Sequence, residues 1–271
     1  MKQIIEYYNR NDEWGRLDRE PLEFIINMHH IKAHLPGGAR ILDNGAGPGK
    51  YAFFLANLGH KVTLSDITPK LVETAIEKAK ENPQLPELEG YHVLDATDLS
   101  VFADNHFDAV LMLGPFYHLQ DEESRRKALN ELRRVTKPGG KVFVAFMTRT
   151  RFLATSLQYP QRWKPNHTAE GIKEFLDTGL FNHDEEGRFT GAYYFNIDDI
   201  KPFMESSGFK TINLIGSRSI AGAMTEEQWS YWRSRGDDEY KTIMELVISE
   251  SENPYVLGFS SHILYIGEKD I

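Results

Sequence analysis

The chain has 271 residues, of which 41% are hydrophobic and 26% charged, a composition that is ordinary for a globular protein. The formal net charge of −9 disfavours non-specific binding to nucleic acid or to an anionic membrane surface. The absence of cysteine excludes disulfides, thiolate metal sites and cysteine nucleophiles. The longest apolar runs have the length of strands, and the first 14 residues lack the apolar core of a secretion signal. We therefore expect one cytoplasmic domain over residues 1–271, with neither a membrane nor a nucleic-acid partner.

Between residues 39 and 147, short apolar runs alternate with stretches of helical periodicity. The expected strands are 40–43, 62–65, 91–94, 107–113 and 142–147. The run at 107–113 is continuously apolar, as expected of a strand whose sheet is covered by helices on both faces. Repeated alternation of strand and helix predicts an α/β fold with a doubly wound, Rossmann-like parallel sheet.

Helix signals separate these strands. Tyr51, Phe54, Leu55 and Leu58 recur at the spacing of one helix face, which predicts a first helix buried on that side. A second helix is expected to open at residues 68–69, where threonine precedes proline. A third is expected from a cap at residue 121 to residue 135, with acidic residues in its first turn and basic residues in its last.

After residue 147 the order of elements is less regular. We expect a helix at 198–207, a strand at 211–215, one or two helices within 225–249 and a final strand at 260–266. The segments 148–194 and 220–255 are interpreted as helical and loop insertions that cover a site on the 39–147 core. The first 35 residues are expected to be helical and to add to that cover.

The strongest motif is ILDNGAGPG at residues 41–49, a glycine loop between a strand and a helix. Such a loop lets a ligand approach the backbone at the carboxyl end of the first strand, where open α/β sheets bind ligands. The spacing is G-x-G-x-G, and Lys50 stands where the dinucleotide fingerprint needs its third glycine. Asp43 would repel a pyrophosphate but suits a ligand with an ammonium group. The alternative is that Asp43 only caps the loop backbone.

Two further carboxylates follow the next two strands. Asp66 ends the second strand, where it could accept both ribose hydroxyls of an adenosine. Asp95 follows the third strand, where it could accept a hydrogen bond from the exocyclic amine of adenine. Each could instead be a helix cap or a solvated loop residue. Because the carboxyl ends of parallel strands share one edge of the sheet, we expect both to lie beside Asp43.

At this point the sequence resembles the class I S-adenosylmethionine-dependent methyltransferases. ILDNGAGPGKYAFFLANLGHKVTLSDIT is similar to motif I and the acidic strand of that family, and YHVLDATDL, FDAVLMLGPFYHL and KPGG match its later landmarks. LGPFYHL together with RRKALNELRRVTKPGG resembles its small-molecule branch. The resemblance covers residues 39–147, and Asn44 departs from the apolar residue usual in the family.

The resemblance implies a seven-stranded sheet whose last strand is antiparallel, with S-adenosyl-L-methionine as cofactor and S-adenosyl-L-homocysteine as product. It also implies cofactor contacts from the loop, the strand ends and the N-terminal helix. The implied residues are Asp43, Gly45, Gly47 and Gly49 at the methionine part, Asp66 and Ile67 at the ribose, Asp95 and Ala96 at the adenine, and Leu113, Tyr8 and Arg16 closing over the cofactor.

Methyl transfer from a sulfonium needs alignment and exclusion of water, and a general base only if the acceptor arrives protonated. His118, just past the fourth strand, is the candidate base, with packing against the next helix as its alternative. Arg149 and Arg151 could bind an acceptor carboxylate or phosphate, or be solvated. Aromatic residues of the insertions could bind an acceptor ring, or form a secondary core. No metal-ligand spacing is present, and the basic cluster at 125–127 is interpreted as the solvated face of a helix.

Three functions are therefore compatible with the sequence. The first is a methyltransferase acting on a small-molecule acceptor. The second is an RNA or protein methyltransferase of the same fold, against which the net acidity and the lack of a basic module argue. The third is a non-methylating protein, either an NAD-type oxidoreductase or a cofactor-binding module without catalysis.

Overall fold

The centre of the protein is a twisted sheet. In the computed structural model, which describes residues 2–10, 12–19 and 21–270, seven strands form this sheet in the order β3-β2-β1-β4-β5-β9-β8. Strands β1 to β5 run parallel, and β9 is antiparallel to both β5 and β8, which confirms the predicted doubly wound sheet with an antiparallel last strand. The strands are β1 Arg40–Asn44, β2 Lys61–Asp66, β3 Gly90–Val93, β4 Phe107–Met112, β5 Thr136–Met147, β8 Phe209–Gly216 and β9 His262–Lys269.

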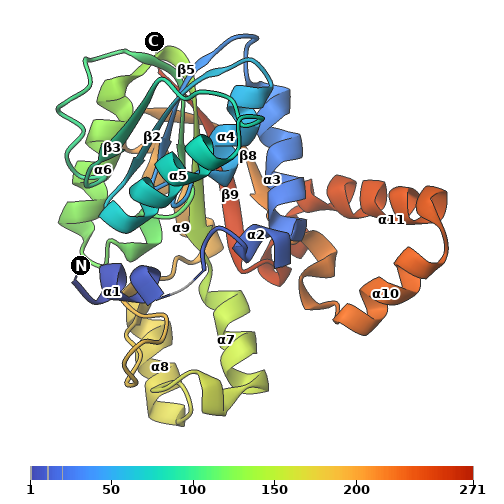
Figure 1. The fold of residues 1–271 in the computed structure, drawn as a ribbon. Helices are drawn as coiled ribbons and strands as arrows, with labels where there is room; N and C mark the ends of the chain where they lie inside the picture. Colours follow the sequence, from blue (N-terminus) through green and yellow to red (C-terminus); the bar gives the residue numbers. More distant parts are fainter. Residues whose placement is uncertain (1, 11, 20, 271) are drawn as a thin grey trace.

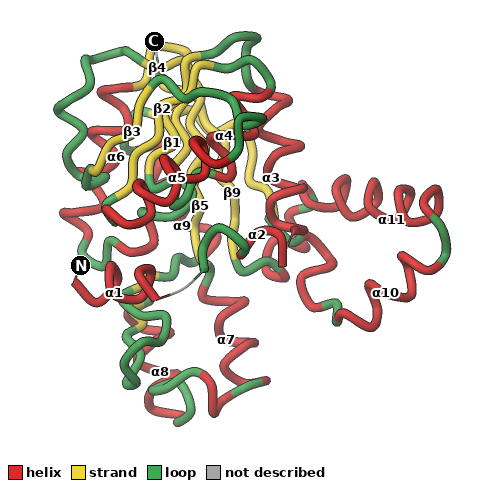
Figure 2. The backbone as a smooth tube through the Cα atoms, in the orientation of Figure 1, coloured by secondary structure: helices red, strands yellow, loops and turns green. Residues whose placement is uncertain are grey.

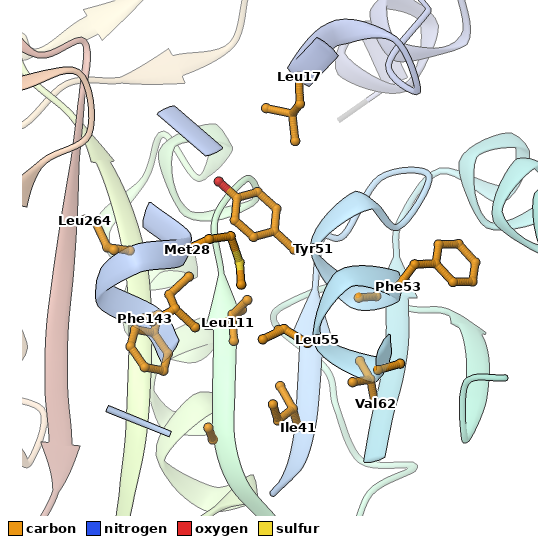
Figure 3. Close-up of a cluster of buried hydrophobic side chains, with 14 of the residues drawn as sticks. Leu17, Met28, Ile41, Tyr51, Phe53, Leu55, Val62, Leu111, Phe143 and Leu264 are labelled. Atoms are coloured by element: carbon orange, nitrogen blue, oxygen red, sulfur yellow. The ribbon is translucent and has the colours of Figure 1, made fainter. Parts of the chain in front are cut away.

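Helices cover both faces of this sheet (Figure 1). The helices of one face are α3 Pro21–His34, α4 Lys50–Asn57 and α5 Pro69–Glu81, and those of the other are α6 Glu122–Val135 and α9 Ile197–Glu205. Alternate residues of a strand enter opposite cores: Ile41 and Leu111 pack on the first face, and Leu42 and Val110 on the second. Figure 3 shows Ile41, Leu111 and their neighbours in the first core. Burial on both faces explains why these strands are continuously apolar.

The predicted buried face of α4 is only half right. Tyr51 and Leu55 are buried, but Phe54 is 36% and Leu58 47% exposed, and Phe53 is buried instead. The Phe54 ring packs edge to face against Phe24 of α3, with centroids 5.4 Å apart. This helix is apolar over most of its circumference, so periodicity alone did not select the side that faces the sheet.

The remaining elements lie at the edges of the sheet. The parallel strands end at the lower edge in Figure 1, where α1, α2, α7 and α8 are gathered, while α10 and α11 project to one side. Figure 2 shows the loops that connect the strands to these helices. These elements are α1 Lys2–Arg10, α2 Arg16–Arg19, η1 Phe116–His118, α7 Arg149–Gln158, η2 Pro160–Arg162, α8 Ala169–Thr178, β6 Leu180–Phe181, β7 Ala192–Tyr193, η3 Ser219–Ala223, α10 Glu226–Ser234, α11 Asp237–Ser249, η4 Glu250–Glu252 and η5 Pro254–Phe259. None of the helices within the described ranges has the length and apolar character needed to cross a bilayer.

The segment 148–194 has an aromatic core of its own. Phe152, Phe175, Phe181 and Tyr194 are buried against one another, and the rings of Phe152 and Tyr194 stack with centroids 4.4 Å apart. These residues therefore form the secondary core that was one of the two alternatives for the aromatic residues.

Arg125 is not on a solvated helix face, as the sequence suggested. It is 5% exposed, donates a hydrogen bond to the carbonyl of Leu119 at 2.7 Å, and places its guanidinium 3.7 Å from the ring centroid of Tyr193. Arg126 and Lys127 are exposed, as expected. Arg125 thus ties α6 to the turn after β4 and to the insertion, and the turn carries part of the site.

Candidate cofactor and acceptor site

A cavity of about 520 Å³ lies at the carboxyl edge of the parallel strands. Its walls come from the ends of β1, β2, β3 and β4 on one side, and from the N-terminal helices and the insertion 148–194 on the other. Of the second insertion, 220–255, Gly222 lines the cavity. The sequence-predicted residues that line it are Tyr8, Arg16, Asp43, Gly45, Gly47, Asp66, Ile67, Asp95, Ala96, Leu113 and His118. The fold therefore brings these residues together, and their roles toward a cofactor remain predictions.

The glycine loop is held tightly against its neighbours. The backbone nitrogens of Gly45 and Ala46 both donate to the carbonyl of Ser65, at 2.7 and 3.0 Å. Gly45 has φ +75°, and a Cβ there would lie 2.1 Å from Cγ of Pro115, so only glycine fits. Gly49 is not part of the cavity wall. It caps α4 with φ +92°, and a Cβ there would lie 2.8 Å from Leu64, which makes its role structural.

Asp43 is a buried carboxylate with unused hydrogen-bonding capacity. Its side chain is 1% exposed, and Oδ2 has no hydrogen-bond partner among the described residues. Burial, and next the charge of Asp66, raise the pKa of Asp43 to about 7. A backbone hydrogen bond from Ala52 satisfies part of the carboxylate, so the loop-capping alternative accounts for only part of its environment. The unpaired oxygen fits a ligand that brings a cationic donor.

Asp66 connects the glycine loop to the second strand. Its Oδ2 accepts from the backbone nitrogen of Gly47 and its Oδ1 from that of Thr68, both at 2.8 Å. The side chain is 7% exposed, and burial raises its pKa. Each carboxylate oxygen can accept a second hydrogen bond, so this arrangement orients Asp66 and leaves it able to bind vicinal hydroxyls.

Asp95 uses one oxygen to stabilise its own turn. Its Oδ1 accepts from the backbone nitrogen and from Oγ1 of Thr97, both at 2.9 Å. This is the local capping role that was the alternative for this residue. Asp95 also lines the cavity together with Ala96, so the two roles are compatible.

The predicted base, His118, is fully engaged by the protein. Its Nε2 accepts from the hydroxyl of Tyr8 at 2.8 Å, and its Nδ1 donates to the carbonyl of Gly191 at 3.2 Å. The side chain is 9% exposed, and burial lowers its pKa to about 4. His118 is therefore a neutral anchor that holds α1 against the insertion, and it could take a proton only if Tyr8 moved away.

Arg16 lies on the N-terminal wall beside acidic groups. Its Nε donates to Oε2 of Glu13 at 3.0 Å. Although burial opposes the shift, the charges of Glu23 and other neighbours hold the pKa of Arg16 above its usual value. The guanidinium is thus a fixed positive charge at the rim of the cavity, as a role toward a carboxylate would require.

The two arginines after β5 behave differently. Arg149 donates from Nε to the carbonyl of Tyr194 at 2.9 Å and from Nη1 to that of Leu176 at 2.7 Å, so it is a structural clamp within the insertion. Arg151 lines the cavity, and burial followed by the charge of Arg218 lowers its pKa. Of the pair, Arg151 is the one whose side chain lines the cavity.

The cavity wall also contains residues that the sequence did not indicate. His262 lines it from the start of β9 and bonds Glu23 of α3. Arg218 lines it from the end of β8. These residues lie outside the recognised motifs, so their only signal was their position beside predicted strand ends. No group of three metal-binding side chains occurs within the described ranges.

These features define a class of protein: an open α/β sheet whose glycine loop and strand-end carboxylates form one nucleoside-sized cavity. Residues 42–144 match the methyltransferase domain family. A ubiquinone biosynthesis O-methyltransferase of Xanthomonas axonopodis pv. citri is 33% identical over 144 residues, covering 51% of this chain and 58% of that protein. A glycine/sarcosine N-methyltransferase of Aphanothece halophytica is 27% identical over 226 residues, covering 79% and 80%.

The solved structures agree on the fold. A methyltransferase structure from Methanosarcina mazei superposes with a TM-score of 0.60 at 22% identity, covering 89% of this chain and 97% of that one. The chain spans only 58% of the length of the Xanthomonas relative. This match therefore concerns the methyltransferase domain and not the whole of that protein. Residues 42–144 thus form a methyltransferase domain, and the fold is shared with S-adenosylmethionine-dependent methyltransferases. Both findings support the class I resemblance and S-adenosylmethionine as the cofactor.

Proposed function

We propose that the protein transfers the methyl group of S-adenosylmethionine to a small-molecule acceptor. The observation that carries this proposal is the single cavity in which the glycine loop, three strand-end carboxylates and a separate, partly aromatic end meet. The names of the two curated relatives support a small acceptor, since one is an O-methyltransferase of ubiquinone biosynthesis and the other an N-methyltransferase of glycine and sarcosine. They do not agree on the methylated atom.

Within this proposal each cofactor-binding residue has a stated task. The free oxygen of Asp43 accepts a hydrogen bond from the amino group of the methionine part, and Arg16 pairs with its carboxylate. Asp66 accepts the ribose hydroxyls. Ile67 also contacts the ribose, Asp95 and Ala96 bind the adenine edge, and Leu113 closes over the cofactor. The charges of ligand and protein are complementary, because the amino group of the methionine part meets Asp43 and its carboxylate meets Arg16.

When bound, the cofactor supplies a methyl group on a sulfonium, a leaving group that needs no further activation. The protein therefore has to orient the acceptor, exclude water and remove a proton where the acceptor carries one. The Tyr8–His118 hydrogen bond serves exclusion, because it closes α1 over the cavity. Phe152, Trp163 and Tyr194 line the acceptor end and suit an acceptor with apolar or ring surface.

The alternatives fit the molecule less well. A nucleic-acid acceptor would meet a net charge of −9, and α1 and the insertion form part of the cavity wall. A dinucleotide would bring its pyrophosphate to the loop that carries Asp43, whose ionised form is already destabilised by burial. Among the described residues, we find no feature that favours a protein that binds the cofactor without catalysing methyl transfer.

Two measurements test the proposal. Calorimetry should show binding of S-adenosylmethionine and no binding of NAD. Mass spectrometry should then detect S-adenosylhomocysteine and a product 14 mass units heavier in a panel of phenols, amines and carboxylates, with bulk RNA and a protein extract as comparison acceptors. Preferential binding of NAD, or methylation of RNA or protein in the absence of any small-molecule product, would overturn the proposal.

A further inference from the structure

Two residues from opposite ends of the chain form a pair at the cavity wall, which His262 lines. Glu23 belongs to α3 and His262 begins β9, and Nδ1 of His262 lies 3.0 Å from Oε2 of Glu23. Their side chains are 17% (His262) and 16% (Glu23) exposed, so the contact is largely shielded from water. None of the recognised motifs contains either residue.

The carboxylate of this pair is held ionised. Although burial opposes the shift, His262, Arg16 and Arg218 lower the pKa of Glu23 to about 2. An ionised carboxylate can only accept, so the Nδ1 of His262 must donate to it. In neutral His262 the proton then resides on Nδ1 and the lone pair on Nε2. A carboxylate that orients a histidine in this way also stabilises the imidazolium that forms when Nε2 takes a proton.

The lone pair of His262 is available to a ligand. His262 lines the cavity, and in the described part of the chain Nε2 has no hydrogen-bond partner. Its ring lies 5.4 Å from that of Tyr117, centroid to centroid, on the turn after β4. His118, by contrast, has both ring nitrogens bonded to the protein. The titratable and charged groups around the pair include Arg16 from α2, Tyr51 from α4, Tyr117 and His118 from η1, and Arg218 after β8.

We propose that His262, oriented by Glu23, is the general base of the transfer, and that the acceptor is a phenol or an ammonium whose methylated atom carries a dissociable proton. This rests on the proposed function. The acceptor's O–H or N–H bond breaks as its proton passes to Nε2 of His262, and the acceptor lone pair forms the new bond to the methyl carbon. The electron pair of the broken sulfur–carbon bond stays on sulfur, and the imidazolium then releases its proton to water.

The test compares three variants with wild type, using acceptors found in the phenol and amine arms of the screen. His262→Gln should lower kcat by 10²–10⁴-fold, the usual contribution of a general base, and leave the calorimetric affinity for S-adenosylmethionine within threefold. With a phenol acceptor, the rate should recover as pH rises toward 10, because the phenol then ionises by itself. His29→Gln, on the exposed face of α3, is the matched control.

Glu23→Gln separates orientation from packing. Glutamine keeps the shape and an acceptor oxygen but removes the charge that favours imidazolium. The acid limb of the kcat/KM profile should therefore move to lower pH, which a merely structural role would not cause. A kcat within threefold of wild type in His262→Gln would overturn the proposal. The proposal would also be overturned if His262→Gln lost affinity for S-adenosylmethionine to the same extent as it lost kcat.

Failure of the proposed role of His262 can be distinguished from failure of the proposed methyltransferase function. If wild type yields no S-adenosylhomocysteine with any acceptor, the function fails, and nitrogen NMR of the imidazoles with S-adenosylmethionine bound still decides the pair. A proton on Nδ1 of His262 and a bare Nε2, changed by Glu23→Gln, would support it. A proton on Nε2 would refute it.

Discussion

Asp43→Asn should stabilise the protein without cofactor and weaken its affinity for the cofactor. The pKa of Asp43 rises from 3.8 to about 7 on folding, so the folded protein disfavours the ionised form. Each tenfold change in proton affinity corresponds to about 1.4 kcal/mol, and ionised Asp43 therefore lowers the free energy of unfolding by about 4 kcal/mol at most. The loss is absent below pH 3.8, grows between pH 4 and 7, and is complete above pH 7.

Asparagine removes this loss because it carries no charge at any pH. The substitution should therefore raise the free energy of unfolding at pH 8 by about 3 kcal/mol more than at pH 4.5, where Asp43 is already largely protonated. The new amide nitrogen takes the place of an unpaired oxygen, which reduces the absolute gain by roughly 1–2 kcal/mol at both pH values. The pH difference is thus the sharper quantity.

Urea unfolding of the cofactor-free protein at both pH values measures this difference, with exposed Asp177→Asn as the control. Calorimetry at pH 8 should show 10- to 100-fold weaker binding of S-adenosylmethionine by Asp43→Asn, the scale of a hydrogen bond to a charged group. Wild type should release a proton on binding near pH 7. Equal changes in unfolding free energy at pH 4.5 and pH 8 would refute the reasoning, because they would show that folding does not raise the pKa of Asp43.

Three further predictions concern the loop, the ribose site and acid stability. Asp66→Ala should weaken S-adenosylmethionine binding by roughly 1.5–3 kcal/mol, and unchanged calorimetric affinity would contradict the ribose assignment. Gly45→Ala should abolish cofactor binding, because its Cβ would collide with Pro115, whereas Gly59→Ala, at φ +88° with no neighbour within 4 Å, should cost about 1 kcal/mol of stability and keep the affinity. Burial lowers the pKa of His30 to about 4, so the folded state binds its proton less readily than the unfolded chain. The free energy of unfolding should then fall by up to about 3 kcal/mol as pH drops from 6.5 to 4, and His30→Gln should remove that part of the dependence in urea titrations.

Local patterns were sufficient where a feature depends on consecutive residues. The glycine loop, Asp43 and the acid-ended second strand could be predicted because a strand, a tight turn and a helix leave their marks within a few positions. The buried strands were recognisable for the same reason, since a parallel sheet covered on both faces needs an uninterrupted apolar run. The cavity position followed from the rule that parallel strands end at one edge.

Contacts between distant segments left no such mark. Glu23 and His262 are 239 positions apart, and each alone has the properties of an ordinary surface or packing residue. His118 lines the cavity at the end of the fourth strand, but its hydrogen bond to Tyr8 depends on where α1 docks. Arg125 is buried because the insertion brings Tyr193 over it. The amino-acid sequence by itself determined the sheet, the loop and the ends of the strands, because neighbouring residues encode them. Only the tertiary structure decided which side chains meet at the acceptor end, since burial and charge there come from segments that are joined by folding alone.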